Sequence, residues 1–370
     1  MRKAAIIALA LLAALVSCTK QAKEVSVAEI SFQTAAYLSK AGIDGTEFPS
    51  DDAFGVYAWA EGTIDGGFFM DDEVVSCDSD GIWKASGTYY WPNDVTIDFF
   101  GYYPHGMRGL GVSERQITYS DIDVEAEQAD ILYSSKAVGY GYNPDGSHRG
   151  LDGSAGVPIL FHHALGKVVV DARTAYDHAE EADGSVYDWD VTVNKVTISD
   201  FCFRGSTTLT LADSPTEGVV EYIKPADASG KHVWTAVDAK TSIDSAPNAR
   251  LNAQEAVTVL PEFFVLPQTI IEPEKSEDGL ALPGQRIQRI SMDITVSTSL
   301  NGEHLFDEHY TRSSYLWLED LPAWEMNYRT RYLVIIYPLG YNSAAERPVI
   351  TFDPAVADWD YTTVSTTIVL

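Results

Sequence analysis

The chain has 370 residues, and its 54 acidic residues outnumber its 25 basic ones to give a formal net charge of −29. A field of this sign repels nucleic acids and anionic membrane surfaces, so both are poor partner candidates. The length is sufficient for two domains of ordinary size. The acidic residues stand singly among aromatic ones instead of in blocks, which indicates a folded protein with a charged surface.

The N-terminus has the layout of a bacterial export signal. Arg2 and Lys3 form a short basic region, and an apolar run follows from Ala4 to Val16, too short to span a bilayer. The ending LVSC, at residues 15–18, is typical of a lipobox, in which the cysteine sulfur accepts a diacylglycerol. We therefore predict a signal peptide over residues 1–17 and lipidation of Cys18, where two or more acyl chains make a durable membrane anchor. A plain signal peptide that contains a cysteine is the alternative.

The remainder of the first half is predicted to consist of short β-strands separated by turns. The chain contains 20 Tyr and 8 Trp, with Thr, Ser and Val abundant, and this composition favours an all-β fold. Strand patterns bounded by Gly or Pro recur along this half. They are found at Val25–Ala36, Phe54–Gly62, Gly87–Pro92, Thr96–Pro104 and Ala129–Tyr140.

A domain boundary is predicted in the segment Gly141–Gly156, which is dense in Gly, Asp, Asn and Ser and offers almost nothing to pack. Strand patterns resume after it, and helical periodicity is nearly absent throughout. Short strands spaced by turn residues indicate β-sandwiches. We therefore divide the mature chain into an N-terminal domain over residues 18–150 and a C-terminal domain over residues 151–370.

No constellation of residues predicts catalysis or a metal site. His162 and His163 are neighbours on a predicted strand and point to opposite faces, so they are not expected to bind one ion together. No HExxH, CxxC or GxSxG pattern occurs, and we predict no enzyme, no catalytic residue, no metal and no cofactor. Cys77 and Cys202 lie far apart in the sequence and are expected to be unpaired.

Two further features have a functional and an ordinary interpretation. Trp59, Trp83 and Trp91 could form a platform that stacks on sugar rings, but packing in a β-sandwich core explains aromatic residues equally well. The Asp-rich segments 78–81 and 143–146 could bind Ca²⁺. They do not have the spacing of an EF-hand loop, and we interpret them as turns.

The last ten residues, Tyr361–Leu370, have the composition of a β-strand. Val364, Ile368 and Leu370 fall on one face with Thr366 between them. Burial of each apolar side chain contributes roughly 1.5–3 kcal/mol, whereas ordering the backbone costs about 1–2 kcal/mol per residue. A ladder of main-chain hydrogen bonds is therefore needed. This strand either closes its own sandwich or completes the sheet of another subunit.

Several segments occur together in an order that resembles one family. They are LVSC at 15–18, YYWPNDVTIDFFGYYP at 89–104, ADILYSS at 129–135, VPILFHHALGKVVV at 157–170, PEFFVLPQ at 261–268, WEMNYRTRYLVIIYP at 324–338 and VADWDYTTVSTTIVL at 356–370. The order is similar to that of the fimbrillins, which are lipoprotein-exported subunits of strand-exchange (type V) pili. The resemblance implies two tandem transthyretin-like, Greek-key β-sandwich domains after a lipoprotein signal peptide.

The resemblance also implies a mechanism of assembly. In stalk subunits of the family, a protease of trypsin-like specificity removes the first strand, and a strand of the next subunit fills the groove. In this chain the removable strand would be Val25–Ala36 and the donor strand would be Tyr361–Leu370. No Arg lies between Arg2 and Arg108, so cleavage is expected at Lys40. The absence of an Arg site leaves open an anchor subunit, which keeps its lipid and its first strand.

The predicted function is therefore that of a stalk or anchor subunit of a cell-surface fimbria that supports adhesion. Its partners would be other fimbrial subunits, the outer membrane through its lipid, and a host or bacterial surface ligand. The expected location is the outer membrane for the precursor and the extracellular fimbria after assembly. The alternative is a surface lipoprotein that binds glycans. A hydrolase would require a cleft with perturbed titratable groups.

Overall fold

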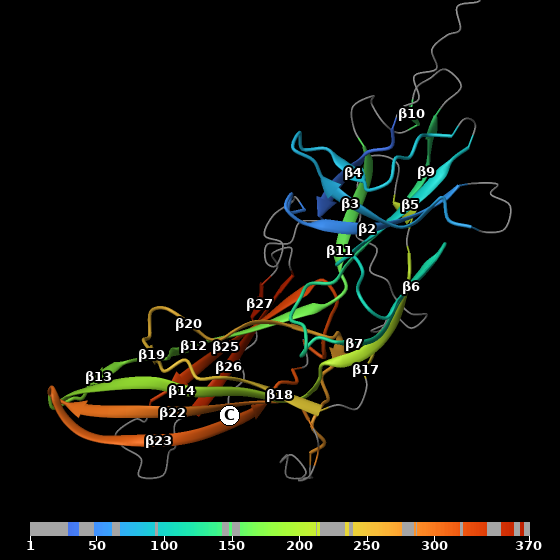
Figure 1. The fold of residues 1–370 in the computed structure, drawn as a ribbon. Coiled ribbons are helices and arrows are strands. Elements are labelled where there is room, and N and C mark those ends of the chain that lie inside the picture. The colour runs from blue at the N-terminus through green and yellow to red at the C-terminus, as the bar shows by residue number, and fades with distance from the viewer. Residues whose placement is uncertain are drawn as a thin grey trace, which may run out of the picture.

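The protein structure, a computed structural model, describes residues 29–36, 48–60, 67–92, 95–142, 148–149, 156–211, 213–214, 234–236, 240–275, 285, 287–318, 321–338, 349–358 and 363–365. Every helix or strand in these ranges is a β-strand (Figure 1). The prediction of an all-β fold is thereby confirmed.

The N-terminal half, with the short strand β16 from the C-terminal half, forms a ten-stranded sheet in which seven strands close into a ring. Around the ring, the hydrogen-bonded order is β5-β2-β3-β4-β1-β11-β8, and a pairing between β8 and β5 completes it. Closure leaves these strands with few free edges. The ring strands are β1 (Phe32–Ala36), β2 (Ala53–Ala60), β3 (Met70–Cys77), β4 (Trp83–Ala85), β5 (Ile97–Tyr103), β8 (Leu132–Ser134) and β11 (Val157–His163). Outside the ring lie β9 (Lys136–Tyr142), β10 (His148–Arg149) and β16 (Asp213–Ser214).

Aromatic side chains fill the inside of the ring. Phe48 lies 5.4 Å from Phe54 and 5.5 Å from Trp83, measured between ring centroids, and both contacts are edge-on. Phe161 meets Phe54 at 5.2 Å in the same geometry. Edge-to-face contacts between aromatic rings add to the stabilisation that burial alone provides. The aromatic strands predicted from the sequence therefore form the core of this half.

The C-terminal half is a β-sandwich of two sheets (Figure 1). In one sheet the order is β20 (Val257–Val265), β12 (Gly166–Thr174), β25 (Tyr328–Tyr337), β26 (Val349–Asp358) and β27 (Thr363–Ser365). The other contains β13 (His178–Glu180), β14 (Val186–Cys202), β22 (Arg289–Leu300) and β23 (Glu303–Tyr315), with β18 (Lys240–Ser245) and β19 (Ala249–Leu251) paired to β14.

The sequence of β22 explains how the sandwich acquires its core. Ile290, Met292, Ile294 and Val296 alternate with Ser, Asp and Thr, and all four apolar side chains are buried. A period of two places them on one face of the strand. They share one hydrophobic cluster with apolar residues of β12, β14, β20 and β25, so the two sheets pack face to face.

Strand pairing also connects the two halves of the chain. A four-stranded sheet has the order β17 (Trp234–Ala236), β15 (Arg204–Thr210), β7 (Gln116–Asp123) and β6 (Leu110–Ser113), and a small one pairs β21 (Gln268–Thr269) with β24 (Ala323–Trp324). In the four-stranded sheet, β7 of the N-terminal half pairs with β15 of the C-terminal half. The side chain of Gln128 further accepts a hydrogen bond from the backbone N–H of Phe264 at 2.8 Å.

The division between residues 150 and 151 stays a prediction. The first strand that the structure describes after it, β11, pairs with β1 and β8 of the N-terminal sheet. The next strand, β12, pairs with β20 and β25 of the C-terminal sheet. The chain therefore passes from one sheet to the other between His163 and Gly166.

Candidate assembly site

The first strand is inserted into the N-terminal ring between β4 and β11. It runs parallel to β11 through five residue pairs, from Phe32 opposite Val157 to Ala36 opposite Phe161. Its pairing with β4 is antiparallel and consists of Phe32 opposite Trp83. Just before the strand, the backbone N–H of Ile30 donates to the carbonyl of Tyr89 at 2.9 Å. Backbone ladders thus hold β1 on both sides, more extensively on the β11 side.

Two side chains of this segment reach into the core of the ring. Ile30 and Phe32 are each only 2% exposed, and the ring of Phe32 lies edge-on to Phe99 at 5.7 Å between centroids. Burial of such side chains contributes roughly 1.5–3 kcal/mol each. The N-terminal segment is therefore part of the hydrophobic core as well as of the sheet.

Gly156 lets β1 come close to β11. A Cβ atom at this position would be closer than 3.0 Å to the backbone N, Cα and C atoms of Phe32, a separation that real Cβ contacts essentially never show. The backbone N–H of Val157, the next residue, donates to the carbonyl of Ser31 at 2.7 Å. Glycine is the residue that permits such close approach of two backbones.

At the other end of the chain, β27 forms the edge of the five-stranded sheet. It pairs antiparallel with β26 through three residue pairs, among them Val364 opposite Val356. The other predicted donor positions, Thr366, Ile368 and Leu370, lie outside the described residues, as do Cys18 and Lys40. The described part of the C-terminal segment is thus at a sheet edge.

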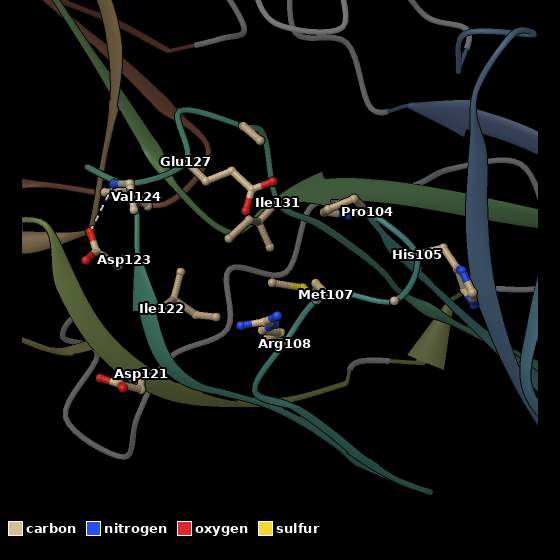
Figure 2. A pocket seen from close by; sticks show the side chains of 13 residues that line it. Pro104, His105, Met107, Arg108, Asp121, Ile122, Asp123, Val124, Glu127 and Ile131 are labelled. Carbon is tan, nitrogen blue, oxygen red and sulfur yellow. Dashed lines mark hydrogen bonds between the residues drawn. The ribbon is translucent and has the colours of Figure 1, made fainter.

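A cavity of about 540 Å³ opens between the segment that follows β5 and the segment that joins β7 to β8. Figure 2 shows the side chains of Arg108 and Glu127 on opposite sides of it. Asp121 forms a salt bridge with Arg204, which lowers the pKa of its carboxyl group. The full lining is Pro104, His105, Gly106, Met107, Arg108, Asp121, Ile122, Asp123, Val124, Ala126, Glu127, Ala129 and Ile131.

The cavity lining carries charges of both signs beside apolar side chains such as Ile122 and Ile131. Sequence reasoning did not find this cavity. The available signal was the alternation of DIDVEAE at residues 121–127. It places the acidic side chains on the solvent-exposed face and buries apolar side chains such as Ile122 and Val124.

A family model for fimbrillin-like proteins matches residues 39–359. The chain belongs to the fimbrillin-like family. The resemblance inferred from the sequence is thereby confirmed. Membership supports a role as a fimbrial subunit, implies a cell-surface location, and places the chain in a family of structural proteins. No curated protein matches the sequence significantly.

One solved structure agrees with the fold of this fimbrillin-like chain, and others are similar to it at lower TM-scores. A fimbrial protein from Bacteroides vulgatus is 13% identical, with a TM-score of 0.50 over 89% of this chain and 99% of that one. A candidate cell adhesion protein from Bacteroides ovatus is 14% identical, with a TM-score of 0.44 over 91% and 99%. Another from Bacteroides uniformis is 16% identical, with a TM-score of 0.42 over 90% and 98%. At 13% identity, the likeness to the first of these structures concerns the fold alone.

The two adjacent histidines of the fimbrillin-like chain are both buried and have separate partners. The Nε2 atom of His162 lies 2.9 Å from the hydroxyl of Ser135, and Nδ1 of His163 lies 2.8 Å from a carboxylate oxygen of Asp130. Burial, aided by His163, lowers the pKa of His162 to about 4. Among the described residues, no group of three or more His, Cys, Asp and Glu side chains is placed to bind a metal.

Other residues singled out in the sequence have ordinary structural roles. Trp83 and Trp91 are buried in the core, and Trp59 packs on Phe68 at 5.2 Å, so the three do not form a common exposed platform. The carboxylate of Asp78 accepts hydrogen bonds from two backbone N–H groups of its own turn. Cys77 and Cys202 are not joined in a disulfide.

The described part of the chain includes no helix with the length and apolarity required to cross a membrane.

Proposed function

We propose that the protein is a stalk or anchor subunit of a cell-surface fimbria that assembles by strand exchange and supports adhesion. The observation that carries this proposal is the position of β1 (Figure 1). It is the first described strand of the chain, yet it lies inside a closed ring, between β4 and β11. Membership in the fimbrillin-like family supports the same role.

Loss of β1 would open the ring. It would leave β4 and β11 with unpaired edges and would uncover the core where Ile30 and Phe32 are buried. An extended segment from another chain can satisfy both needs, because its backbone completes the sheet and alternate side chains fill the core. The apolar face of the C-terminal segment, with Val364, Ile368 and Leu370 as plugs and Thr366 between them, has the required pattern.

The N-terminus determines whether the subunit belongs to the stalk or the anchor. Lipidated Cys18 would hold the precursor at the outer membrane, and cleavage after Lys40 would release the segment that contains β1. We expect a stalk subunit to begin at Ala41 and an anchor to begin at acylated Cys18. N-terminal sequencing and mass spectrometry of the assembled protein distinguish the two. In a stalk, Lys40→Gln is expected to retain the first strand and stop polymerisation. Unchanged processing of that variant contradicts cleavage at Lys40.

Strand exchange itself is tested at the C-terminus. Replacement of Val364, Ile368 and Leu370 by Ser is expected to abolish SDS-resistant ladders, because three plugs lose their apolar burial. Deletion of residues 361–370 is expected to do the same. The matched control changes the opposite face, with Thr363→Ser, Ser365→Thr and Thr367→Ser, and is expected to keep the ladders. Filaments of normal length from the deletion variant rule out donation by this segment.

A further inference from the structure

A long strand at the edge of the C-terminal sandwich is open to pairing on one side. β23 contains 13 residues, and among the described strands it pairs only with β22. Figure 1 shows it along the outer margin of the sheet. A strand in this position presents a row of N–H and C=O groups that can bind another strand.

The usual protection of such an edge is incomplete here. The sequence of β23, EHLFDEHYTRSSY, contains no Pro, Gly or Lys. Its pairing with β22 is irregular only at Leu305, so the edge is regular from Phe306 to Tyr315. Two large apolar side chains are exposed on it, Leu305 at 44% and Phe306 at 47%. The charged residues Glu303, Asp307, Glu308 and Arg312 remain, and like charges directly opposite one another disfavour pairing. These charges therefore select among the registers in which β23 could meet another strand.

We propose that β23 pairs antiparallel with β23 of a second copy of this chain, in the register that places Tyr310 opposite itself. A two-fold axis perpendicular to the sheet relates the strands in such a pair. Each residue is then opposite one on the same face, and the two residue numbers have a constant, even sum. Every symmetric register is therefore centred on one residue of β23.

Neighbouring registers are less favourable. Centring on Asp307 or on Glu308 sets two identical carboxylates directly opposite each other. Centring on His309 sets two imidazoles opposite each other and Arg312 opposite Phe306. Centring on Thr311 leaves both acidic residues without a basic partner. On the face that Glu308, Tyr310 and Arg312 share, none of these registers sets opposite charges against each other.

The register centred on Tyr310 satisfies the charges. Glu308 lies opposite Arg312, and symmetry makes this pair occur twice. Phe306 lies opposite Ser314, also twice, so the exposed aromatic ring meets a small side chain. No like charges are directly opposite. Pairs of opposite charge are among the contacts that stabilise neighbouring antiparallel strands.

Contacts within β23 hold the side chains of Glu308 and Arg312 close to Tyr310. The hydroxyl of Tyr310 donates to the carboxylate of Glu308, and the guanidinium of Arg312 lies 4.9 Å above the ring of Tyr310. Glu308 and Arg312 therefore flank Tyr310 on one face of the strand. From these positions each can reach the opposite charge on a second copy. The proposed pairing of β23 with β23 involves neither β1 nor β27. It would therefore join subunits side by side, independently of the proposed strand exchange.

Cysteine cross-linking on cells tests the register. In full-length protein with Cys77→Ser and Cys202→Ser, we expect Tyr310→Cys to form an intermolecular disulfide under mild oxidation, because residues directly opposite have Cα atoms about 4.5–5.5 Å apart. The matched control is Glu308→Cys, whose two copies would be separated by four residues along the strand, about 14 Å. Peptide mapping of the cross-link identifies the joined residues. Equal cross-linking of both variants, or none by Tyr310→Cys, overturns the proposal.

Charge reversal tests the same pairing without cysteines. Glu308→Arg sets arginines opposite each other twice and is expected to weaken the dimer roughly tenfold in sedimentation equilibrium of the full chain in detergent. Glu308→Arg combined with Arg312→Glu restores opposite charges and is expected to recover the wild-type dissociation constant. A monomeric wild type, an unaffected single variant, or a double variant as weak as the single one overturns the proposal.

Discussion

Gly156→Ala is expected to release the first strand from the N-terminal ring. The added Cβ would be closer than 3.0 Å to three backbone atoms of Phe32, and backbone atoms cannot turn aside as the end of a flexible side chain can. Either β1 shifts away from β11 or it detaches. If it detaches, burial of Ile30 and Phe32 is lost, which corresponds to about 3–6 kcal/mol of the free energy of unfolding.

Urea unfolding and limited proteolysis measure this effect. The Gly156→Ala variant is expected to unfold at a lower urea concentration. Proteolytic cleavage near Lys40 is also expected to become faster, because a detached β1 no longer anchors the chain that follows it. Gly67→Ala is the matched control, since a Cβ at that position would meet nothing within 4 Å. It should change stability by about 0.5 kcal/mol or less. Equal stability of the two variants would show that β1 does not depend on this contact.

The same substitution bears on assembly. A donor strand that replaces β1 would lie against the same stretch of β11, so Gly156→Ala should also prevent SDS-resistant ladders although the C-terminal segment is intact. Loss of ladders in this variant and in the plug variant would place both segments in one reaction. Ladders that persist in Gly156→Ala while the strand is loosened would argue that the donor binds elsewhere.

Local pattern sufficed to predict the strand content, but not the way in which the strands join. The period-two alternation of β22 is the pattern of a half-buried strand, and the side chains at its apolar positions are the buried ones. The parallel pairing of β1 with β11 joins residues more than 120 positions apart, and local sequence patterns do not encode such a partner. Closure of the ring through β5 and β8 was missed for the same reason.

Composition alone does not reveal what an individual glycine does. The segment 141–156 predicts a domain boundary because it is rich in Gly and polar residues. At its end, Gly156 serves a packing role that depends on Phe32, far away in the sequence. The two histidines are a similar case. Alternation predicted opposite faces, but both side chains are buried, because Ser135 and Asp130 provide polar partners on each side.

His162 is expected to make the stability of the protein depend on pH. Burial lowers its pKa in the folded state to about 4, from an ordinary value of 6.5. Between these values the unfolded chain binds more protons than the folded chain, so the free energy of unfolding falls as the pH falls. The contribution is complete above about pH 6.5 and decreases by about 3 kcal/mol by about pH 4.

The side chains around His162 explain why its pKa is lowered. His163 is its neighbour, the ring of Tyr133 lies 5.6 Å away, and its Nε2 atom faces the hydroxyl of Ser135. The carboxylate of Asp130 is held by His163. A proton on His162 would therefore place a charge in a buried site beside a second imidazole, and burial makes the charged form unfavourable.

Urea unfolding at a series of pH values measures this dependence. His162→Gln retains a polar group that can face Ser135 but does not titrate, so its stability should lose about 3 kcal/mol less than wild type between pH 6.5 and 4. His309→Gln, an exposed histidine on β23, is the matched control and should follow the wild-type curve. Since His162 lies on β11, which carries β1, acid should also loosen the first strand. Parallel curves for His162→Gln and wild type would mean that His162 is not the group that titrates.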